Sequence, residues 1–139
     1  IEPKYSNAEF TPAEMNEVYN CLDVFVSTSS AEGWGLTITE AMSVGLPIVC
    51  GNHTSIKEIT RNGKDVFSIF GQHEHVQIHD GNAIRYCLDS NQVSHQLWLL
   101  FIEYLEKKEL EYHDYDYQKN KYNWDNIALT WTQVLNKHL

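Results

Sequence analysis

The chain has 139 residues and is therefore long enough for about one domain. Its 42% hydrophobic and 21% charged residues are ordinary for a globular protein and exclude a disordered chain, and no apolar run approaches the length that spans a bilayer. With 19 acidic against 10 basic side chains, its formal net charge of −9 excludes the cationic surface that nucleic-acid binding requires.

The first predicted element is a helix that begins at Pro12. Thr11 is suited to cap this helix, and Glu14 completes a capping box three residues later. Apolar residues then recur at the spacing of one helical face, namely Met15, Val18, Tyr19 and Leu22. Residues 24–28 are apolar and rich in β-branched side chains, which predicts a short buried strand.

A loop with two glycines follows this strand at residues 29–35. Residues 36–44 predict a second helix, which Gly45 ends in a left-handed conformation. Pro47 begins a second buried strand that runs to Cys50. The next predicted elements are a short helix over residues 55–60, a turn at residues 62–63 and a third strand over residues 66–70.

The second half of the chain predicts further helices. We expect a short helix over residues 81–89, a longer one over residues 92–111, and an irregular connection over residues 112–122. Asn123 is suited to cap a last helix, with Asp125 in its first turn. Three tryptophans fall on the apolar stripes of these helices and are expected in the core: Trp98, Trp124 and Trp131.

The alternation of strands and helices predicts the fold class. Strands that are apolar throughout, separated by helices, are typical of an α/β fold with a Rossmann-like parallel sheet and flanking helices. In such sheets the ligand binds at the carboxyl ends of the strands. The loop at residues 29–35 follows a strand directly, so we expect the chemistry of this protein at that loop.

The segment from residue 32 to residue 40 combines two glycines with two carboxylates at the start of a helix. Gly33 and Gly35 allow a ligand to approach the backbone, and the helix then presents N–H groups that suit phosphate oxygens. Glu32 lies in the loop and Glu40 about one turn into the helix, so the two carboxylates bracket this cradle. Because carboxylates accept hydrogen bonds from hydroxyl groups, the combination indicates a sugar–phosphate compound, although a Gly-x-Gly before a helix is a weak signal alone.

The same stretch resembles the nucleotide-sugar-binding half of the GT-B glycosyltransferases. The resemblance is to the large retaining group, family 4-like, whose signature is two glutamates separated by seven residues. The matching segments are residues 23–26, 29, 32–37, 40–42 and 45–49, with a further likeness at residues 122–128. Roughly residues 11–70 are covered well.

The resemblance implies the partial C-terminal lobe of a GT-B fold, with extra C-terminal helices and with residues 1–139 as the donor-nucleotide-binding domain. Glu32 would be the catalytic-site residue that contacts the donor sugar, Glu40 would hold the ribose hydroxyls, and Glu58 would have a mostly structural role. The diphosphate and sugar would lie against the backbone of Gly33, Gly35, Leu36 and Thr37.

The implied activity is the transfer of a hexose from a UDP-, GDP- or ADP-sugar to a saccharide, lipid or protein acceptor, with retention of configuration and without a bound cofactor or metal. The N-terminal lobe and the basic diphosphate-binding residues of the family would precede Ile1. The chain begins without an initiator methionine or a signal segment, so we expect a fragment that is inactive alone.

Two features of the sequence favour alternatives. Thr54 and Ser55 replace the family's usual Gly-Gly pair, and Lys57 replaces a usual proline, so side chains stand where the backbone would approach the donor. These departures favour a catalytically inactive, glycosyltransferase-like binding or scaffold subunit. A glycosidase that uses Glu32 and Glu40 as acid and nucleophile is disfavoured, because the phosphate cradle would then have no purpose.

The remaining candidates have structural interpretations. Trp34 either stacks on the donor or packs against the protein, and both readings stay open. Three histidines are interpreted as solvated loop residues rather than metal ligands, because no fourth ligand is evident: His73, His75 and His79. Three cysteines are expected as buried free thiols, typical of a cytoplasmic protein whose membrane association, if any, resides in other parts: Cys21, Cys50 and Cys87.

Overall fold

The computed structural model describes residues 10–64, 66–69, 72–108 and 119–138. In its first half, strands and helices alternate: α1 (Pro12–Asn20), β1 (Phe25–Ser27), α2 (Leu36–Ser43), β2 (Ile48–Gly51), α3 (Ile56–Ile59) and β3 (Phe67–Ile69). The second half contains β4 (Gln72–Gln77), the short 3₁₀ helix η1 (Ile78–Asp80), β5 (Ala83–Leu88), α4 (Ser90–Lys107) and α6 (Trp124–His138).

The predicted local signals at both ends of the early helices are confirmed. Thr11 Oγ1 accepts a hydrogen bond from Glu14 N at 3.3 Å, and Glu14 Oε2 accepts one from Thr11 N at 2.7 Å. These two bonds form the capping box that starts α1. After the C-terminal end of α2, Gly45 adopts the left-handed conformation with φ +81°, which a residue with a side chain would rarely adopt.

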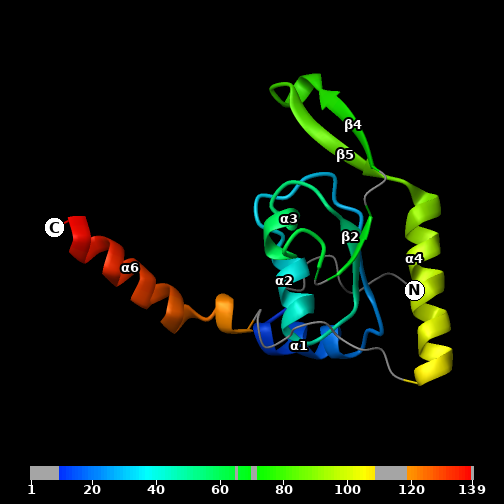
Figure 1. The fold of residues 1–139 in the computed structure, drawn as a ribbon, viewed down its shortest axis with the longest axis horizontal. Coiled ribbons are helices and arrows are strands. Elements are labelled where there is room, and N and C mark those ends of the chain that lie inside the picture. Colours follow the sequence, from blue (N-terminus) through cyan, green and yellow to red (C-terminus); the bar gives the residue numbers. More distant parts are fainter. Residues whose placement is uncertain (1–9, 65, 70–71, 109–118, 139) are drawn as a thin grey trace.

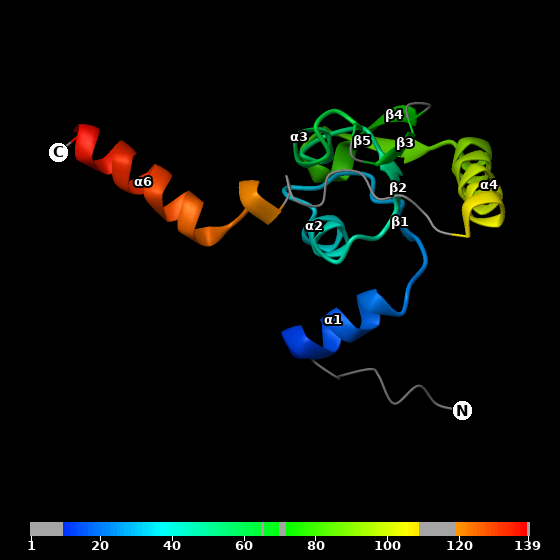
Figure 2. The ribbon, with the colours of Figure 1, turned by 60° about the horizontal axis from the view of Figure 1, so that its bottom comes forward.

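Strands β1, β2 and β3 form a parallel sheet in that order. Phe25 pairs with Ile48, and Val49 pairs with Phe67. Helix α2 contacts β1 and β2, whereas α4 contacts β2 and β3, and Figures 1 and 2 show these helices on opposite sides of the sheet. The predicted α/β class with helices on both faces is therefore confirmed.

The core lies on both faces of the central strand β2, all four residues of which are buried. A strand that is covered on both faces needs apolar side chains at every position. The larger cluster joins β2 to α1, α2 and α3, and its fully buried members include Ile38, Met42, Ile48, Ile56 and Ile59. The smaller cluster, on the α4 side, is centred on Val49 and Leu100.

The predicted helix over residues 81–89 is wrong. Residues 83–88 form β5, which pairs antiparallel with β4 from Gln77↔Ala83 to Gln72↔Leu88. Gly81 and Asn82 both have positive φ in the turn between the strands, which suits a tight chain reversal. Figure 1 shows this hairpin projecting from the upper edge of the sheet.

Both long helices are present. Helix α4 begins at Ser90, two residues before the predicted start, and residues 109–111 of the prediction lie outside the described residues. The two helices bury less than their apolar stripes suggest. Asn123 Oδ1 accepts from the Asp125 N–H at 2.8 Å, which confirms the expected cap of α6. Figures 1 and 2 show α6 extending away from the sheet, and its two tryptophans are 80% and 62% exposed. On α4, Leu100 is buried, whereas Trp98 is 58% exposed. The expectation that Trp98, Trp124 and Trp131 are core residues is wrong.

The cysteine prediction is correct in part. All three thiols are free, and Cys50 is buried in β2, but Cys21 and Cys87 are exposed. Burial raises the pKa of the Cys50 thiol to about 12. Within the described part of the chain, no helix combines the length and apolar character that crossing a membrane requires.

Candidate functional site

The loop after β1 and the loop after β2 meet at the carboxyl edge of the sheet, as the parallel topology predicts. Glu32 N donates a hydrogen bond to Thr54 Oγ1 at 3.2 Å. Ser55 Oγ is 2.9 Å from Glu32 O and 3.0 Å from Trp34 O, and it acts as donor toward these carbonyls. Hydroxyl groups from the second loop therefore tie down the backbone of the first.

This role of the hydroxyl groups is not apparent from the sequence. Thr54 has φ +45°, a left-handed conformation that favours glycine and that residues with a side chain rarely adopt. Its side chain is turned to the Glu32 amide. The replacement of glycine by Thr54 and Ser55 therefore supplies cross-links to the Glu32 loop, which residue spacing alone does not reveal.

Gly35 forms the junction between this loop and α2. It is the N-cap residue and has φ +92° and ψ +56°, which is a left-handed conformation. A Cβ atom at this position would lie 3.3 Å from Ile59 Cδ1 and 3.5 Å from Ile38 Cδ1. Glycine is favoured here by the backbone angle and by the apolar side chains beneath it, whereas the close approach of a ligand to this backbone stays a prediction.

The start of α2 carries no side-chain cap. The amides of Ile38 and Thr39 both donate to Gly35 O at 3.1 Å. The N–H groups of Leu36 and Thr37 precede these bonds and have no partner within the helix. Because the positive end of the helix dipole coincides with these N–H groups, the junction suits an anion.

Glu40 is held by Tyr19, whose place in the sequence predicts only packing. Tyr19 Oη, at the end of α1, donates a hydrogen bond to Glu40 Oε2 at 2.8 Å. Burial, with a further contribution from Glu40, raises the pKa of Tyr19 to about 12. Glu40 itself is exposed, and together with Tyr19 it lines a cleft of about 380 Å³ between α1 and α2.

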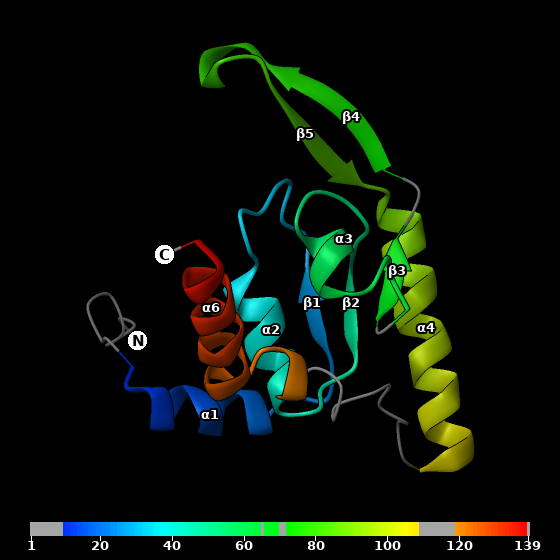
Figure 3. The ribbon, with the colours of Figure 1, turned by 60° about the vertical axis from the view of Figure 1, so that its left-hand side comes forward.

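The predicted site residues therefore fall into two groups. Glu32, Gly33, Gly35, Leu36 and Thr37 lie together at the junction of the loop and α2. The carboxylate of Glu40 faces α1, and Figure 3 shows α1 at the far end of α2 from that loop. That one ligand reaches both carboxylates stays a prediction. Glu58 is exposed on α3.

Trp34 has a partner in the last part of the chain. Its ring meets the ring of Tyr122 edge to face, with the centroids 5.2 Å apart. This contact supports the packing role, while 39% of Trp34 stays exposed and accessible to a ligand.

The three histidines that the sequence predicts to be solvated loop residues lie on the hairpin instead. His73 and His75 are in β4, and His79 is in η1, so the expectation of a loop is wrong. His75 Nδ1 is 3.7 Å from Cys87 Sγ. Among the residues that the structure describes, no three histidine, cysteine or acidic residues are grouped so that they could hold a metal ion. The side chain of His73 lies outside the described part.

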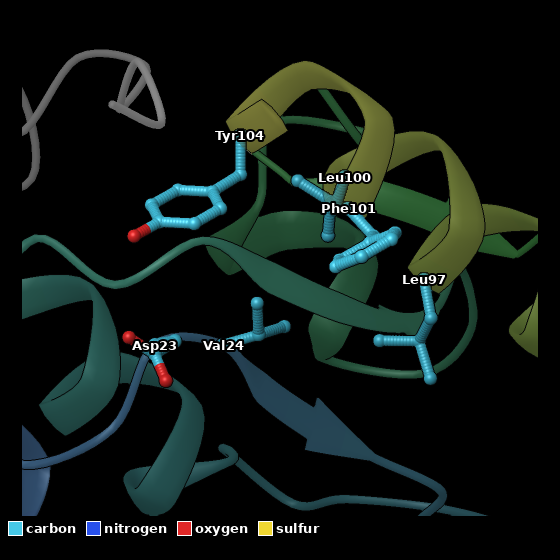
Figure 4. A pocket seen from close by; sticks show the side chains of 6 residues that line it. All are labelled: Asp23, Val24, Leu97, Leu100, Phe101 and Tyr104. Carbon is cyan, nitrogen blue, oxygen red and sulfur yellow. The ribbon is translucent and has the colours of Figure 1, made fainter. Parts of the chain in front are cut away.

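A larger groove, of about 460 Å³, lies elsewhere on the molecule. Figure 4 shows Leu97, Phe101 and Tyr104 projecting from α4 toward Asp23 and Val24. This groove adjoins the start of β1, at the opposite edge from the strand ends where α/β sheets bind ligands, and its charged group is a carboxylate. It is therefore a poorer match to a nucleotide than the junction at Gly35.

Comparisons with known proteins identify the family. Residues 7–97 match the family described as glycosyl transferases group 1. The GtfA subunit of a UDP-N-acetylglucosamine–peptide N-acetylglucosaminyltransferase from Streptococcus gordonii is 27% identical over 131 residues, which are 88% of this chain and 22% of that protein. The corresponding subunit from Streptococcus pneumoniae is 33% identical over 82 residues, 54% of this chain and 16% of that protein.

A third relative is a mannosyltransferase. The O-antigen chain mannosyltransferase B of Escherichia coli is 50% identical over 42 residues, which are 30% of this chain and 11% of that protein. The chain thus spans no more than 22% of the length of these relatives. The match over residues 7–97 includes the Glu32 loop, α2 and Glu40, and from it we conclude that this chain belongs to the glycosyl transferases group 1 family.

Proposed function

We propose that this chain is the donor-binding part of an enzyme that transfers a hexose from a nucleoside-diphosphate sugar to an acceptor, with retention of configuration. The observation that carries the proposal is the start of α2 directly after Gly35, which has no side-chain cap. It lies next to Glu32, whose backbone amide is held by Thr54. Unpaired N–H groups beside a carboxylate match a compound with a phosphate group and a sugar diol.

Each group of the site has a role in this proposal. The N–H groups of Leu36 and Thr37 receive oxygens of the diphosphate, and the helix dipole stabilises the negative charge that grows as the diphosphate leaves. Glu32 accepts hydrogen bonds from hydroxyls of the donor sugar. Glu40 Oε2 is used by Tyr19, so Oε1 is the oxygen that accepts from the ribose.

The relatives support the proposed substrate class. Two of them are named for transfer of N-acetylglucosamine from its UDP derivative to a peptide, and the third for a mannosyl group. We propose a UDP-sugar as the first donor to test, with GDP- and ADP-sugars next, and a saccharide, lipid or protein as acceptor. We propose that the protein acts in the cytoplasm.

The sheet supports the proposal that further parts of the protein complete the site. Strand β1 is an edge strand among the described residues, although parallel sheets normally bury their strands. The apolar groove of Figure 4 adjoins the start of this strand. We propose that residues 1–139 are part of the C-terminal lobe, and that the acceptor lobe and the basic groups for the diphosphate are in other parts of the chain.

Binding of nucleotides tests the donor-binding proposal. Ligand-observed NMR with UDP, GDP and ADP should give a signal for at least one nucleotide, and Glu40→Ala should remove that signal. Glu17→Ala is the matched control, because Glu17 is an exposed glutamate on α1. A nucleotide signal that Glu40→Ala retains would contradict the proposed ribose contact, and the lack of any signal would contradict donor binding by this chain.

A second candidate is an inactive, glycosyltransferase-like subunit. It is favoured because the positions of the usual Gly-Gly pair carry hydroxyl side chains, and because two relatives are named as subunits. Glu32→Ala in the complete protein distinguishes the candidates. An enzyme loses most of its transfer while its nucleoside diphosphate still binds, whereas an inactive subunit shows no transfer for the variant to reduce.

A further inference from the structure

The β4–β5 hairpin is anchored on the end of β2, next to the candidate site. A Cβ atom on Gly51 would lie 2.5 Å from His53 Nε2 and 2.7 Å from Leu88 Cδ2. A strand residue of β5 and a residue after β2 thus both press on the last position of β2. Figures 1 and 3 show the hairpin rising at the same edge of the sheet as the loop after β1.

Tyr86 of β5 makes two contacts at this edge. Its ring stacks on the ring of His53, with centroids 4.7 Å apart and planes 6° from parallel. Its backbone N–H donates to Ser30 O at 2.9 Å, within the loop that carries Glu32. One residue of the hairpin therefore touches both loops of the site.

His53 connects Tyr86 to the residues that hold Glu32. His53 is buried, with 2% of the residue exposed, and its Nδ1 lies 3.3 Å from Thr54 Oγ1. The same Thr54 oxygen accepts the bond from Glu32 N at 3.2 Å. A threonine hydroxyl has one proton to donate and two lone pairs that accept, so Thr54 Oγ1 can hold the Glu32 amide and pair with Nδ1 in either tautomer of the ring. The path runs from Tyr86 through His53 and Thr54 to the Glu32 backbone.

We propose that the hairpin positions the Glu32 loop through this path, and that Tyr86, His53 and Thr54 are positioning residues for recognition of the donor sugar. The sugar-recognition part rests on the proposed function. Glu40 is fixed separately, by Tyr19 on α1. Loosening the path therefore weakens contacts to the sugar and leaves contacts to the nucleotide unchanged, a split that a general loss of stability would not produce.

The first test measures the order of the loop without any ligand. Amide hydrogen exchange of Glu32 should be about three- to tenfold faster in Thr54→Val, which loses the hydroxyl but keeps the branched shape, because one hydrogen bond is lost. Thr54→Ser keeps the hydroxyl and should exchange like the parent chain. Tyr86→Ala should accelerate the same amide, whereas Tyr86→Phe keeps the stacked ring and should not.

The second test compares the affinities of UDP and UDP-N-acetylglucosamine. Thr54→Val and Tyr86→Ala should bind UDP-N-acetylglucosamine at least threefold more weakly and UDP equally well, while the Ser and Phe variants match the parent. Equal exchange rates in all four variants, or a parallel loss of both ligands, would overturn the positioning role. If the parent binds neither ligand, donor binding fails, and faster Glu32 exchange in Thr54→Val and Tyr86→Ala still decides whether the hairpin positions the loop.

Discussion

Gly51→Ala is the substitution for which the structure gives the sharpest expectation. The added methyl group would lie 2.5 and 2.6 Å from two atoms of the His53 ring and 2.7 Å from Leu88 Cδ2. Carbon atoms in contact normally stay about 3.5–4.0 Å apart, so both side chains must move by about 1 Å. The site is fully buried, and an overpacked core costs about 1–3 kcal/mol.

Gly33→Ala is the matched control for stability. The same methyl group at Gly33 would meet nothing within 4 Å. This control should stay within about 0.5 kcal/mol of the parent, as surface substitutions usually do. Urea unfolding of both variants, followed by circular dichroism, gives the difference directly, and Gly51→Ala should also lower the melting temperature by roughly 4–12 °C at about 4 °C per kcal/mol. Equal stability of the two variants would refute the claim that His53 and Leu88 are fixed against β2.

Three further predictions concern titration and thiol exposure. The pKa of Tyr19 is raised to about 12, so the folded state holds the phenol proton more tightly than the unfolded state does. The free energy of unfolding should therefore fall as the pH rises from about 10 to about 12. Tyr19→Phe should show a smaller fall in alkaline unfolding curves. Burial lowers the pKa of His53, although the Ser29 backbone and Glu32 oppose this shift. The folded state is therefore stabilised above about pH 6.5, and this stabilisation should be lost as the pH falls through the pKa of the folded state. An equal decline in His53→Phe would contradict this expectation. A thiol reagent should modify Cys21 and Cys87 in the folded protein and Cys50 only after unfolding, and mass spectrometry of the labelled peptides checks this order.

Local signals in the sequence were sufficient for much of the first half of the fold. The capping box at Thr11, the left-handed Gly45 and the apolar strands each depend on residues close in the chain, and the structure confirms them. The position of the Glu32 loop at the carboxyl edge also followed from the sequence, because parallel strands place their ends together.

The errors in the second half have a common physical cause. Apolar spacing shows which face of a helix is apolar, but it does not show whether another element covers that face. Trp98 and Trp131 fit a helical stripe and nevertheless stay 58% and 62% exposed, and the ring that Trp98 meets belongs to Phe101 of the same helix. Residues 83–88 become a strand because they pair with β4, and this partner is not visible in their own composition.

The contacts that shape the candidate site were decided by the tertiary structure. Tyr19 reaches Glu40 across 21 positions, and Thr54 reaches Glu32 across 22. The ring of Tyr86 meets His53 only because the hairpin folds back onto the end of β2. The sequence by itself determined the family pattern and the parallel sheet, and it predicted the loop that we propose as the donor site. The tertiary structure decided which side chains hold that loop, because the ends of the strands converge in space. Hydrogen bonds and ring contacts act over a few ångströms, whatever the separation of the two residues along the chain.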